Sequence, residues 1–488
     1  MDLFLRPYGF LKYQAKTSTV LTCVALGALF ALGFPPFHHW YVSIISLSIF
    51  FNLFVNSSKP KSVFTAVFYF SLSYFSLSSY WVINTFLVVV NDTPIGYLVG
   101  AIALLVVASY MALFTAFCVS VSKFISDKLH GFNFAIVLIP LAWSTSEYLR
   151  SVLQAGQPMH YVGYMVGNND YLIQLASLMN VYVVSFILVL VSLLLSMGYR
   201  HLIYGTFILT AVFLFGMYRV EYLVEANNET KDLKVRLVNA NINQKQLLQA
   251  HNTFEIVDEY IKITQKKTAE EFVPELIIWP EGVLQFYIED TDYSKKNREH
   301  ITEFMSDGQV LITGGPRYEH KNSINYFTSM FQLNADGQLL GQYDKHRLVP
   351  WGEFLPFREY IPNTIANIFD AKDYTPGTGP LELNLKNGLK ILPLLCAEGH
   401  FPQMLSEYQE DQDFIVMIGN EAWLEGTTEP SQFLVNARYR AVESGLPVLL
   451  TSNKGYLAII DNKGIIKKSI YKNEASVLDG VLNVALNP

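Results

Sequence analysis

Three residues that could together perform acyl transfer lie at or near the ends of predicted strands in the second half of this 488-residue chain. Cys396 ends an apolar run, Glu281 follows a Trp-Pro pair that closes another, and Lys345 lies in a polar stretch. A cysteine thiolate can hold an acyl group as a thioester, which divides acyl transfer into two steps. Glu281 could accept the thiol proton. Lys345 could stabilise the developing oxyanion and favour the thiolate.

Each of these residues has an ordinary structural explanation when it is taken alone. A single cysteine at a strand end usually packs as a buried small hydrophobe. A glutamate after a proline is usually a turn residue, and a lysine is usually solvated at the surface. The combination at strand ends, rather than any one residue, therefore carries the catalytic interpretation.

The elements that must position these residues are short apolar strands that alternate with polar helical stretches from residue 233 onward. The strands are predicted at 235–238, 276–280, 310–315, 392–396, 414–418 and 448–451, and helices at 252–270 and 432–444. Alternation of this kind predicts a layered α/β domain. Active groups gather at strand ends in such domains.

The first half of the chain has a different composition. Hydrophobic residues make up 51% of the whole chain and charged residues 16%, below the roughly 25% charge of ordinary soluble proteins. Most of the deficit lies between residues 17 and 216, where long apolar runs recur. A spanning helix needs about 20 mostly apolar residues. We therefore predict seven membrane spans, near 17–34, 39–56, 63–82, 95–122, 132–150, 171–197 and 202–219.

The distribution of lysine and arginine sets the predicted orientation, because positive charge concentrates in cytoplasmic loops. The alternate loops that contain it hold Arg6, Lys12, Lys16, Lys59, Lys61, Lys123, Lys128 and Arg200. Arg150 and Arg219 are the exceptions. The N-terminus is thus predicted to be cytoplasmic and the residues after the seventh span extracytoplasmic. The predicted domains are a transmembrane domain at 1–220, a linker at 221–231 and a catalytic domain at 232–488.

Two polar features of the membrane half need an explanation. Glu147 and Arg150 are helical neighbours near the outer end of the fifth span and are interpreted as an interfacial pair, although intramembrane charges are also candidates for function. The loop 154–169 is predicted on the same side as the catalytic domain and could border a lipid entrance. The aromatic loop 33–40 is interpreted as a structural turn.

Several function classes are disfavoured. The net charge of -7, without a basic patch interleaved with aromatics, argues against nucleic-acid binding. Cys23 and Cys118 lie in apolar runs and are predicted to pack as small hydrophobes, so no disulfide framework is implied. The histidines are scattered, and we predict neither a metal site nor a cofactor.

The motifs around the three catalytic candidates resemble the Glu-Lys-Cys set of the nitrilase (carbon-nitrogen hydrolase) superfamily. They are Trp279-Pro280-Glu281, Lys345 with Pro350-Trp351-Gly352-Glu353-Phe354, and Cys396-Ala397-Glu398. Joined to a membrane bundle, the chain resembles the apolipoprotein N-acyltransferase family over nearly its whole length. Further similar segments are 33–40, 143–150, 420–423 and 437–443. The resemblance implies an αββα sandwich for the second half.

The resemblance also implies a function and residue roles. An acyl chain from a phospholipid, typically phosphatidylethanolamine, would pass to Cys396 and then to the α-amino group of a diacylglyceryl-cysteine lipoprotein. Glu281 would be the general base, Cys396 the nucleophile and Lys345 the oxyanion stabiliser. Glu353 and Glu398 would orient Lys345 and the incoming amine, and Trp423 would line the pocket. The family further implies a monomer in the bacterial inner membrane.

The chain departs from the family pattern outside the triad, at positions that concern substrate contacts and lipid preference. Ala397 replaces an aromatic residue, Leu248 stands where a tryptophan is common, and the loop Gly156-Gln157-Pro158-Met159 replaces Gly-Phe-Pro-Trp. No final membrane helix is expected before Pro488.

Two other function classes stay open at this stage. A membrane-tethered amidase would share the triad, but a hydrolase of soluble amides needs no seven-span bundle. A non-enzymatic lipid-binding or transport protein with a decayed site would not need Glu281, Lys345 and Cys396 intact.

Overall fold

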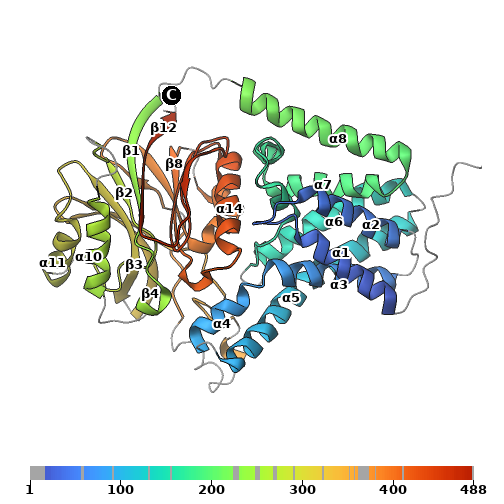
Figure 1. Cartoon of the computed structure of the whole chain (residues 1–488), viewed down its shortest axis with the longest axis horizontal. Helices are drawn as coiled ribbons and strands as arrows, with labels where there is room; N and C mark the ends of the chain where they lie inside the picture. Colours follow the sequence, from blue (N-terminus) through green and yellow to red (C-terminus); the bar gives the residue numbers. More distant parts are fainter. Residues whose placement is uncertain are drawn as a thin grey trace, which may run out of the picture. The chain divides into compact units, whose positions relative to one another are not determined.

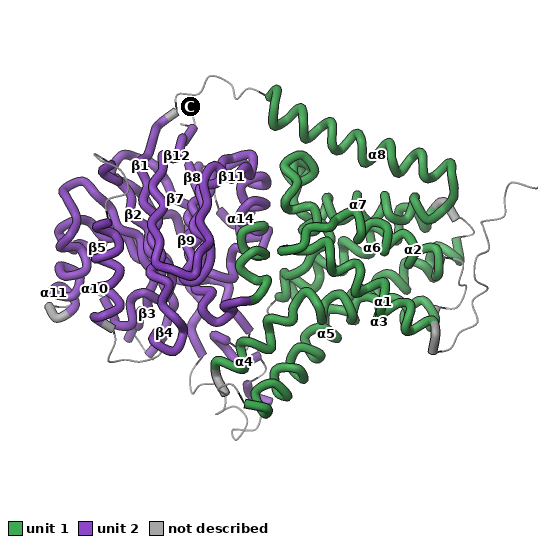
Figure 2. Tube along the Cα trace, viewed as in Figure 1, with its two compact units in different colours: residues 1–224, 427–435 green, residues 225–426, 436–488 purple. Residues whose placement is uncertain are grey.

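The chain divides into two compact units in the computed structural model (Figure 2). The helical unit comprises residues 1–224 and 427–435, and the sheet unit comprises residues 225–426 and 436–488. The structure describes residues 17–55, 60–90, 93–129, 132–153, 156–223, 230–247, 253–266, 272–288, 292–320, 324–350, 352–356, 358–360, 373–379, 381–408 and 411–485. Most of the predicted linker, together with Leu248 and Trp351, lies outside these residues.

The helical unit is a bundle of apolar helices. These are α1 (Thr17–Ala31), α2 (Trp40–Val55), α3 (Pro60–Ser78), α4 (Val82–Val90), α5 (Pro94–Lys128), α6 (Phe132–Val152), α7 (Val181–Leu195) and α8 (Tyr199–Met217). The short turns η1 (Val162–Val166) and η2 (Leu172–Leu178) precede α7, and η3 (Tyr218–Tyr222) extends α8. Helix α3 packs against α1 and α5, α6 against α5 and α7, and α8 against α7.

Among the described helices, two are long and apolar enough to cross a membrane unaided, Pro94–Lys128 and Tyr199–Tyr222. A third span results if Lys61–Ser78 and Val82–Val88, which are bent by 46°, are counted as one. Helices α1, α2 and α7 have 15, 16 and 15 residues, fewer than the roughly 20 of a full span. The seven-span count stays a prediction.

Two of the seven predicted spans differ locally from the helices of the structure. The predicted span 63–82 is broken after Ser78. The first part of 171–197 forms η2, because α7 starts only where the Asn180 side chain accepts a hydrogen bond from the backbone of Tyr182.

The outward surface of the long helices is apolar, as a lipid-facing surface requires. Ile102, Leu105 and Val106 on α5 and Ile203 and Phe207 on α8 are all exposed. A soluble bundle would place such side chains inside. The described part of the helical unit therefore has the composition of a membrane domain.

The buried charges of α6 hold a loop within the helical unit. Glu147 accepts a hydrogen bond from the backbone of Val162 at 2.7 Å. Arg150 donates to the carbonyl of Gln157 at 2.7 Å and lies over the ring of Tyr161. Both side chains thus bond to the segment 157–162, which is part of the predicted lipid-entrance loop.

The sheet unit contains two six-stranded sheets, in the orders β12-β1-β2-β3-β4-β5 and β11-β10-β9-β8-β7-β6. The first sheet consists of β1 (Thr230–Asn239), β2 (Leu276–Ile278), β3 (Val310–His320), β4 (Ile324–Asn334), β5 (Leu339–Asp344) and β12 (Ser476–Ala485). The second consists of β6 (Leu383–Asn384), β7 (Lys390–Leu395), β8 (Phe414–Asn420), β9 (Val448–Asn453), β10 (Leu457–Ile460) and β11 (Ile466–Ile470). Strands β1, β2 and β3 run parallel, as do β7, β8 and β9.

The central strands are buried on both faces. Leu237 and Ile278 of the first sheet and Leu395 and Val416 of the second belong to one apolar cluster between the sheets. The opposite face of the first sheet, including Ile277, packs against α10 (Thr253–Thr264) and α11 (Asp292–Thr302). Parallel strands covered in this way are expected to be continuously hydrophobic.

The helices complete four layers in the order α, β, β, α. Figure 1 shows α10 and α11 outside the first sheet and α14 (Glu429–Ser444) outside the second. The smaller helical segments are α9 (Gln244–Leu247), α13 (Gln403–Glu407), η5 (Arg358–Tyr360), η6 (Cys396–His400) and η7 (Ala422–Leu424). The predicted fold class, an all-α membrane bundle followed by an αββα sandwich, is confirmed.

Candidate active site

Glu281 follows β2 in a turn that is hydrogen-bonded to the neighbouring strand β3. The backbone of Trp279 donates to Ile312, and that of Gly314 donates to Pro280. A Cβ at Gly314 would lie 2.7 Å from the Cα of Glu281, so only glycine permits this approach. The Glu281 side chain is 9% exposed. The turn therefore places a buried carboxylate at the carboxyl end of the first sheet.

Lys345 comes directly after β5 and is 1% exposed. Its ammonium group donates to Glu353 at 2.7 Å. The strand end is held by Asp344, which forms two hydrogen bonds with the guanidinium of Arg317 at 2.8 and 2.6 Å and a third with Ser329 at 2.6 Å. Paired, planar contacts of this kind restrict orientation strongly. Lys345 is therefore held at its ammonium group by Glu353 and at its backbone by the bonded Asp344 before it.

Glu353 has a second bond besides the one to Lys345. Its other oxygen accepts from the backbone of Val349 at 2.7 Å. The backbone of Glu353 also donates to Val349 and accepts from Tyr374. The segment after Lys345 is thus folded back so that this carboxylate meets the ammonium group.

Cys396 follows β7 and begins the turn η6, with a φ of +52°. This left-handed conformation is uncommon for a residue other than glycine, and strained backbone of this kind clusters at functional sites. The side chain is half-buried. Cys23 on α1 is buried and Cys118 on α5 is half-buried, and all three cysteines are free thiols.

Glu398 is fully buried and accepts four hydrogen bonds. One oxygen accepts from the Tyr343 hydroxyl at 2.8 Å and from the backbones of His346 and Arg347 at 2.7 and 3.0 Å. The other accepts from the backbone of Leu395 at 2.9 Å. This carboxylate therefore joins the Cys396 turn of the second sheet to the Lys345 segment of the first.

The electrostatics of the triad favour a neutral thiol beside a potential base. Burial raises the pKa of Cys396 well above its ordinary value, and the adjacent Glu281 raises it further, whereas Lys345 lowers it. Burial also raises the pKa of Glu281, while Lys345 and the hydrogen bond with Cys396 lower it. The expected help from Lys345 is present but smaller than the opposing effects, so a base is needed to generate the thiolate.

Lys345 itself remains charged. Burial would lower the pKa of its ammonium group, but Glu353, Cys396 and Glu281 raise it above the ordinary value. A permanent positive charge in a buried position is the arrangement that stabilises an oxyanion.

The remaining predicted site residues occupy less informative positions. Trp423 lies in η7, beyond the end of β8, and is half-buried, so its role in lining a pocket stays a prediction. Ala397 is half-buried in η6. Within the described residues, no group of three His, Cys, Asp or Glu side chains is arranged to hold a metal ion.

Two features of the site were missed in the sequence. Tyr343, which donates to Glu398, follows the strand alternation and precedes Asp344-Lys345, but nothing local marks it as more than a core residue. The asparagines Asn239, Asn420 and Asn453 end the strands β1, β8 and β9, one or two residues beyond the strands predicted there. Their shared place at the carboxyl ends of strands is the sequence feature that could have identified them as part of the site.

Both halves of the chain match models of known protein families. A family model described as carbon-nitrogen hydrolase matches residues 234–485, and one described as apolipoprotein N-acyltransferase N-terminal domain matches residues 26–194. Since the first of these covers more than half of the chain, the protein belongs to the carbon-nitrogen hydrolase family. It combines that domain with the N-terminal domain of the apolipoprotein N-acyltransferases, and this confirms the resemblance seen in the motifs.

Individual relatives are similar to this chain over nearly its whole length. The apolipoprotein N-acyltransferase of Allorhizobium ampelinum is 26% identical over 489 residues, covering 96% of this chain and 90% of the relative. That of Rickettsia typhi is 27% identical, covering 95% and 92%. Among solved structures, Saccharomyces cerevisiae Nit3, a member of branch 10 of the nitrilase superfamily, has a TM-score of 0.40 and 15% identity, covering 52% of this chain and 90% of the other.

Proposed function

We propose that this protein is an N-acyltransferase that moves a fatty acyl chain from a phospholipid, through a thioester on Cys396, to the α-amino group of the diacylglyceryl-cysteine of an apolipoprotein. The observation that carries the proposal is the hydrogen-bonded Glu281–Cys396 pair beside the buried Lys345, in a chain whose other unit consists of apolar helices. Both substrates are lipid-anchored, which explains why the catalytic domain is joined to a membrane domain.

The first half-reaction forms the thioester. Glu281 accepts the Cys396 proton as the sulfur attacks the ester carbonyl carbon of the phospholipid. The resulting oxyanion is stabilised by the ammonium of Lys345. Collapse breaks the bond to the glycerol oxygen, which takes the proton from Glu281 and leaves as a lysophospholipid.

The second half-reaction transfers the acyl group. The α-amino nitrogen attacks the thioester carbonyl, again with the oxyanion beside Lys345, and Glu281 accepts the proton that the nitrogen loses. The carbon–sulfur bond then breaks, and the thiolate recovers the proton. No cofactor enters either step.

The finer assignments follow from charge distribution and from the relatives. We propose a cytoplasmic N-terminus and an extracytoplasmic catalytic domain in the bacterial inner membrane, because lysine and arginine concentrate in alternate loops. Phosphatidylethanolamine is the proposed donor, a diacylglyceryl lipoprotein the acceptor, and the monomer the functional state.

The testing experiment is intact-protein mass spectrometry after incubation with phosphatidylethanolamine, comparing wild type with Cys396→Ala. A fatty-acyl mass on wild type only, removed by hydroxylamine, is expected. Addition of a diacylglyceryl lipopeptide with a free amine should then discharge the adduct and yield the N-acylated peptide. A folded wild type that never gains the adduct would contradict the proposal.

The family name supports a second candidate, a membrane-tethered amidase that passes the acyl group to water. It shares the thioester on Cys396, but forms this thioester from an amide with release of an amine, and its acceptor is water. An acyl-enzyme that discharges equally fast with and without the lipopeptide would favour this candidate.

A further inference from the structure

The catalytic triad is assembled from two different sheets. Glu281 and Lys345 follow strands β2 and β5 of the first sheet, whereas Cys396 follows β7 of the second. Apolar side chains fill the space between the sheets, and hydrophobic contacts are not directional. The position of the base relative to the nucleophile therefore depends on directional bonds that join the sheets at this edge.

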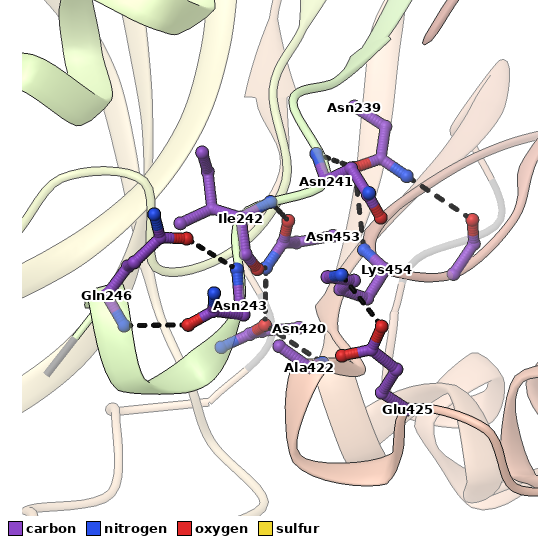
Figure 3. A network of polar contacts seen from close by, with 11 residues as sticks. Asn239, Asn241, Ile242, Asn243, Gln246, Asn420, Ala422, Glu425, Asn453 and Lys454 are labelled. Atoms are coloured by element: carbon purple, nitrogen blue, oxygen red, sulfur yellow. Dashed lines mark hydrogen bonds and ion pairs between the residues drawn. The ribbon is translucent and has the colours of Figure 1, made fainter. Parts of the chain in front are cut away.

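Asn453, at the end of β9, supplies such bonds (Figure 3). Its side-chain oxygen accepts from the backbone of Ile242 at 3.0 Å, and its nitrogen donates to the carbonyl of the same residue at 2.8 Å. The nitrogen also donates to the side chain of Asn420 at 3.0 Å. Because Ile242 offers both a donor and an acceptor, the orientation of the amide is unambiguous. Asn453 is 1% exposed.

Asn420 continues the chain of bonds towards Glu281. Its nitrogen donates to Gln244 at 2.9 Å, and a Cβ at Gly282 would lie 3.6 Å from that nitrogen. Gly282, the residue after Glu281, therefore lies close to the Asn420 side chain. Asn239 at the end of β1 adds contacts to the backbones of Lys454 and Gly455 at 3.4 and 3.5 Å. We call Asn239, Gln244, Asn420 and Asn453 the amide cluster.

The amide cluster lies at the same edge as the nucleophile. In the parallel pairing of the second sheet, Leu395 is opposite Ile418, and Asn420 is opposite Asn453. Along the paired strands, Cys396 therefore lies one residue before the level of Asn420. In the first sheet, Leu237 is opposite Ile278, which places the end of β1 beside the Glu281 turn.

We propose that Asn453 is a positioning residue for the acylation chemistry, because its amide fixes the Glu281 side of the site against the Cys396 side. Side-chain amides suit this role, since they offer donors and an acceptor in a fixed plane and add no charge beside a base that must ionise. The inference deepens the proposed function and rests on its assignment of Glu281 as base to Cys396.

The test is the rate at which iodoacetamide alkylates Cys396 in the full-length protein, followed by mass spectrometry of the peptide that contains this residue. This readout needs no phospholipid. In Asn453→Ala we expect alkylation to slow by on the order of tenfold to a hundredfold, as misplacement of a catalytic group by about 1 Å does. The part of the pH profile that depends on Glu281 should disappear. Acylation by phosphatidylethanolamine should slow in parallel, with the KM for the phospholipid unchanged.

Asn334 provides a matched control. It is 5% exposed, ends β4 and forms hydrogen bonds with Asp336 and Gln338 in its own hairpin turn, at the opposite edge of the first sheet. Asn334→Ala should lower the melting temperature to a similar degree and leave the alkylation profile unchanged. If Asn453→Ala does not fold, Asn420→Ala, which breaks the next link, should show the slower alkylation.

The outcomes distinguish the positioning role of Asn453 from the proposed acyl transfer. An alkylation rate and pH profile in the Asn453 and Asn420 variants equal to those of Asn334→Ala would overturn the inference. If wild type never forms the thioester but its Cys396 alkylation still depends on Asn453, the inference stands while the proposed acyl transfer fails.

Discussion

Replacement of Glu398 by glutamine tests whether this residue serves the amine step or the architecture of the whole site. All four neighbours of the carboxylate are donors: the Tyr343 hydroxyl and the backbones of His346, Arg347 and Leu395. An ionised carboxylate accepts from all of them, even though burial raises the pKa of Glu398. The observed geometry therefore fits the charged form, with three hydrogen bonds on one carboxylate oxygen and one on the other.

The magnitude follows from these bonds. If the glutamine oxygen keeps the three bonds to Tyr343, His346 and Arg347, its NH2 group faces the backbone N–H of Leu395. That N–H loses its partner, at a cost of about 1–3 kcal/mol. The three remaining bonds lose charge assistance, roughly 1 kcal/mol each. Removing a buried charge offsets part of this loss, so we expect a net destabilisation of about 2–4 kcal/mol.

The assay is thermal unfolding in detergent together with the two half-reactions measured separately. A loss of this size lowers the melting temperature of a domain of 150–250 residues by about 4–16 °C. Since Glu398 joins the Cys396 turn to the Lys345 segment, acylation of the enzyme and transfer to the lipopeptide should slow by similar factors. The exposed Glu474, which forms an ion pair with Lys472, provides a control, and Glu474→Gln should change neither stability nor rate.

One result would refute this reasoning. If Glu398→Gln forms the thioester at the wild-type rate, keeps its melting temperature and slows only the transfer to the amine, then Glu398 acts on the acceptor, and the four hydrogen bonds are not its main contribution.

Three further predictions concern the triad. Glu281→Ala should prevent thioester formation, because the raised pKa of Cys396 leaves the thiol without a base; wild-type amounts of acyl-enzyme by mass spectrometry would contradict this assignment. The rate of Cys396 alkylation should fall as the pH drops through the raised pKa of Glu281, because the protonated carboxyl can no longer accept the thiol proton; in Glu281→Gln this lower transition should vanish, leaving only a rise at alkaline pH as the thiol ionises. Lys345→Met should slow thioester formation by on the order of a hundredfold or more and lower stability by about 3–5 kcal/mol, because it leaves the half-buried Glu353 and the buried Glu281 without their cation; an unchanged single-turnover rate would exclude Lys345 from stabilising the oxyanion.

The sequence alone determined the features that depend on local pattern. The runs 276–280, 392–396 and 414–418 are continuously apolar, which specifies buried parallel strands whatever surrounds them. Glu281 and Cys396 could be recognised because they lie at the ends of the predicted strands 276–280 and 392–396, where side chains become available for chemistry. Lys345 follows β5, which is not among the strands with predicted bounds. The sparse charges of the first half likewise indicate a membrane domain from composition alone.

Local pattern was less reliable where tertiary contacts decide. The predicted span 171–197 contains η2, which packs against α7 and α8 instead of continuing as one helix. The partners of Glu147 and Arg150 lie in the loop 157–162. These partners are farther along the chain than the three or four residues over which helical spacing predicts contacts. Hydrophobic periodicity indicates which face is buried, but it does not indicate what the buried polar groups contact.

Only the tertiary structure decided how the triad is assembled. The sequence places Glu281, Lys345 and Cys396 at strand ends, but it does not show that the base and the lysine belong to one sheet and the nucleophile to the other. Nor does it show that Glu398 and Asn453 bond across that division. The physical reason is that strand formation depends on residues near in sequence, whereas the pairing of sheets and the directional bonds between them depend on residues 50 to more than 200 positions apart.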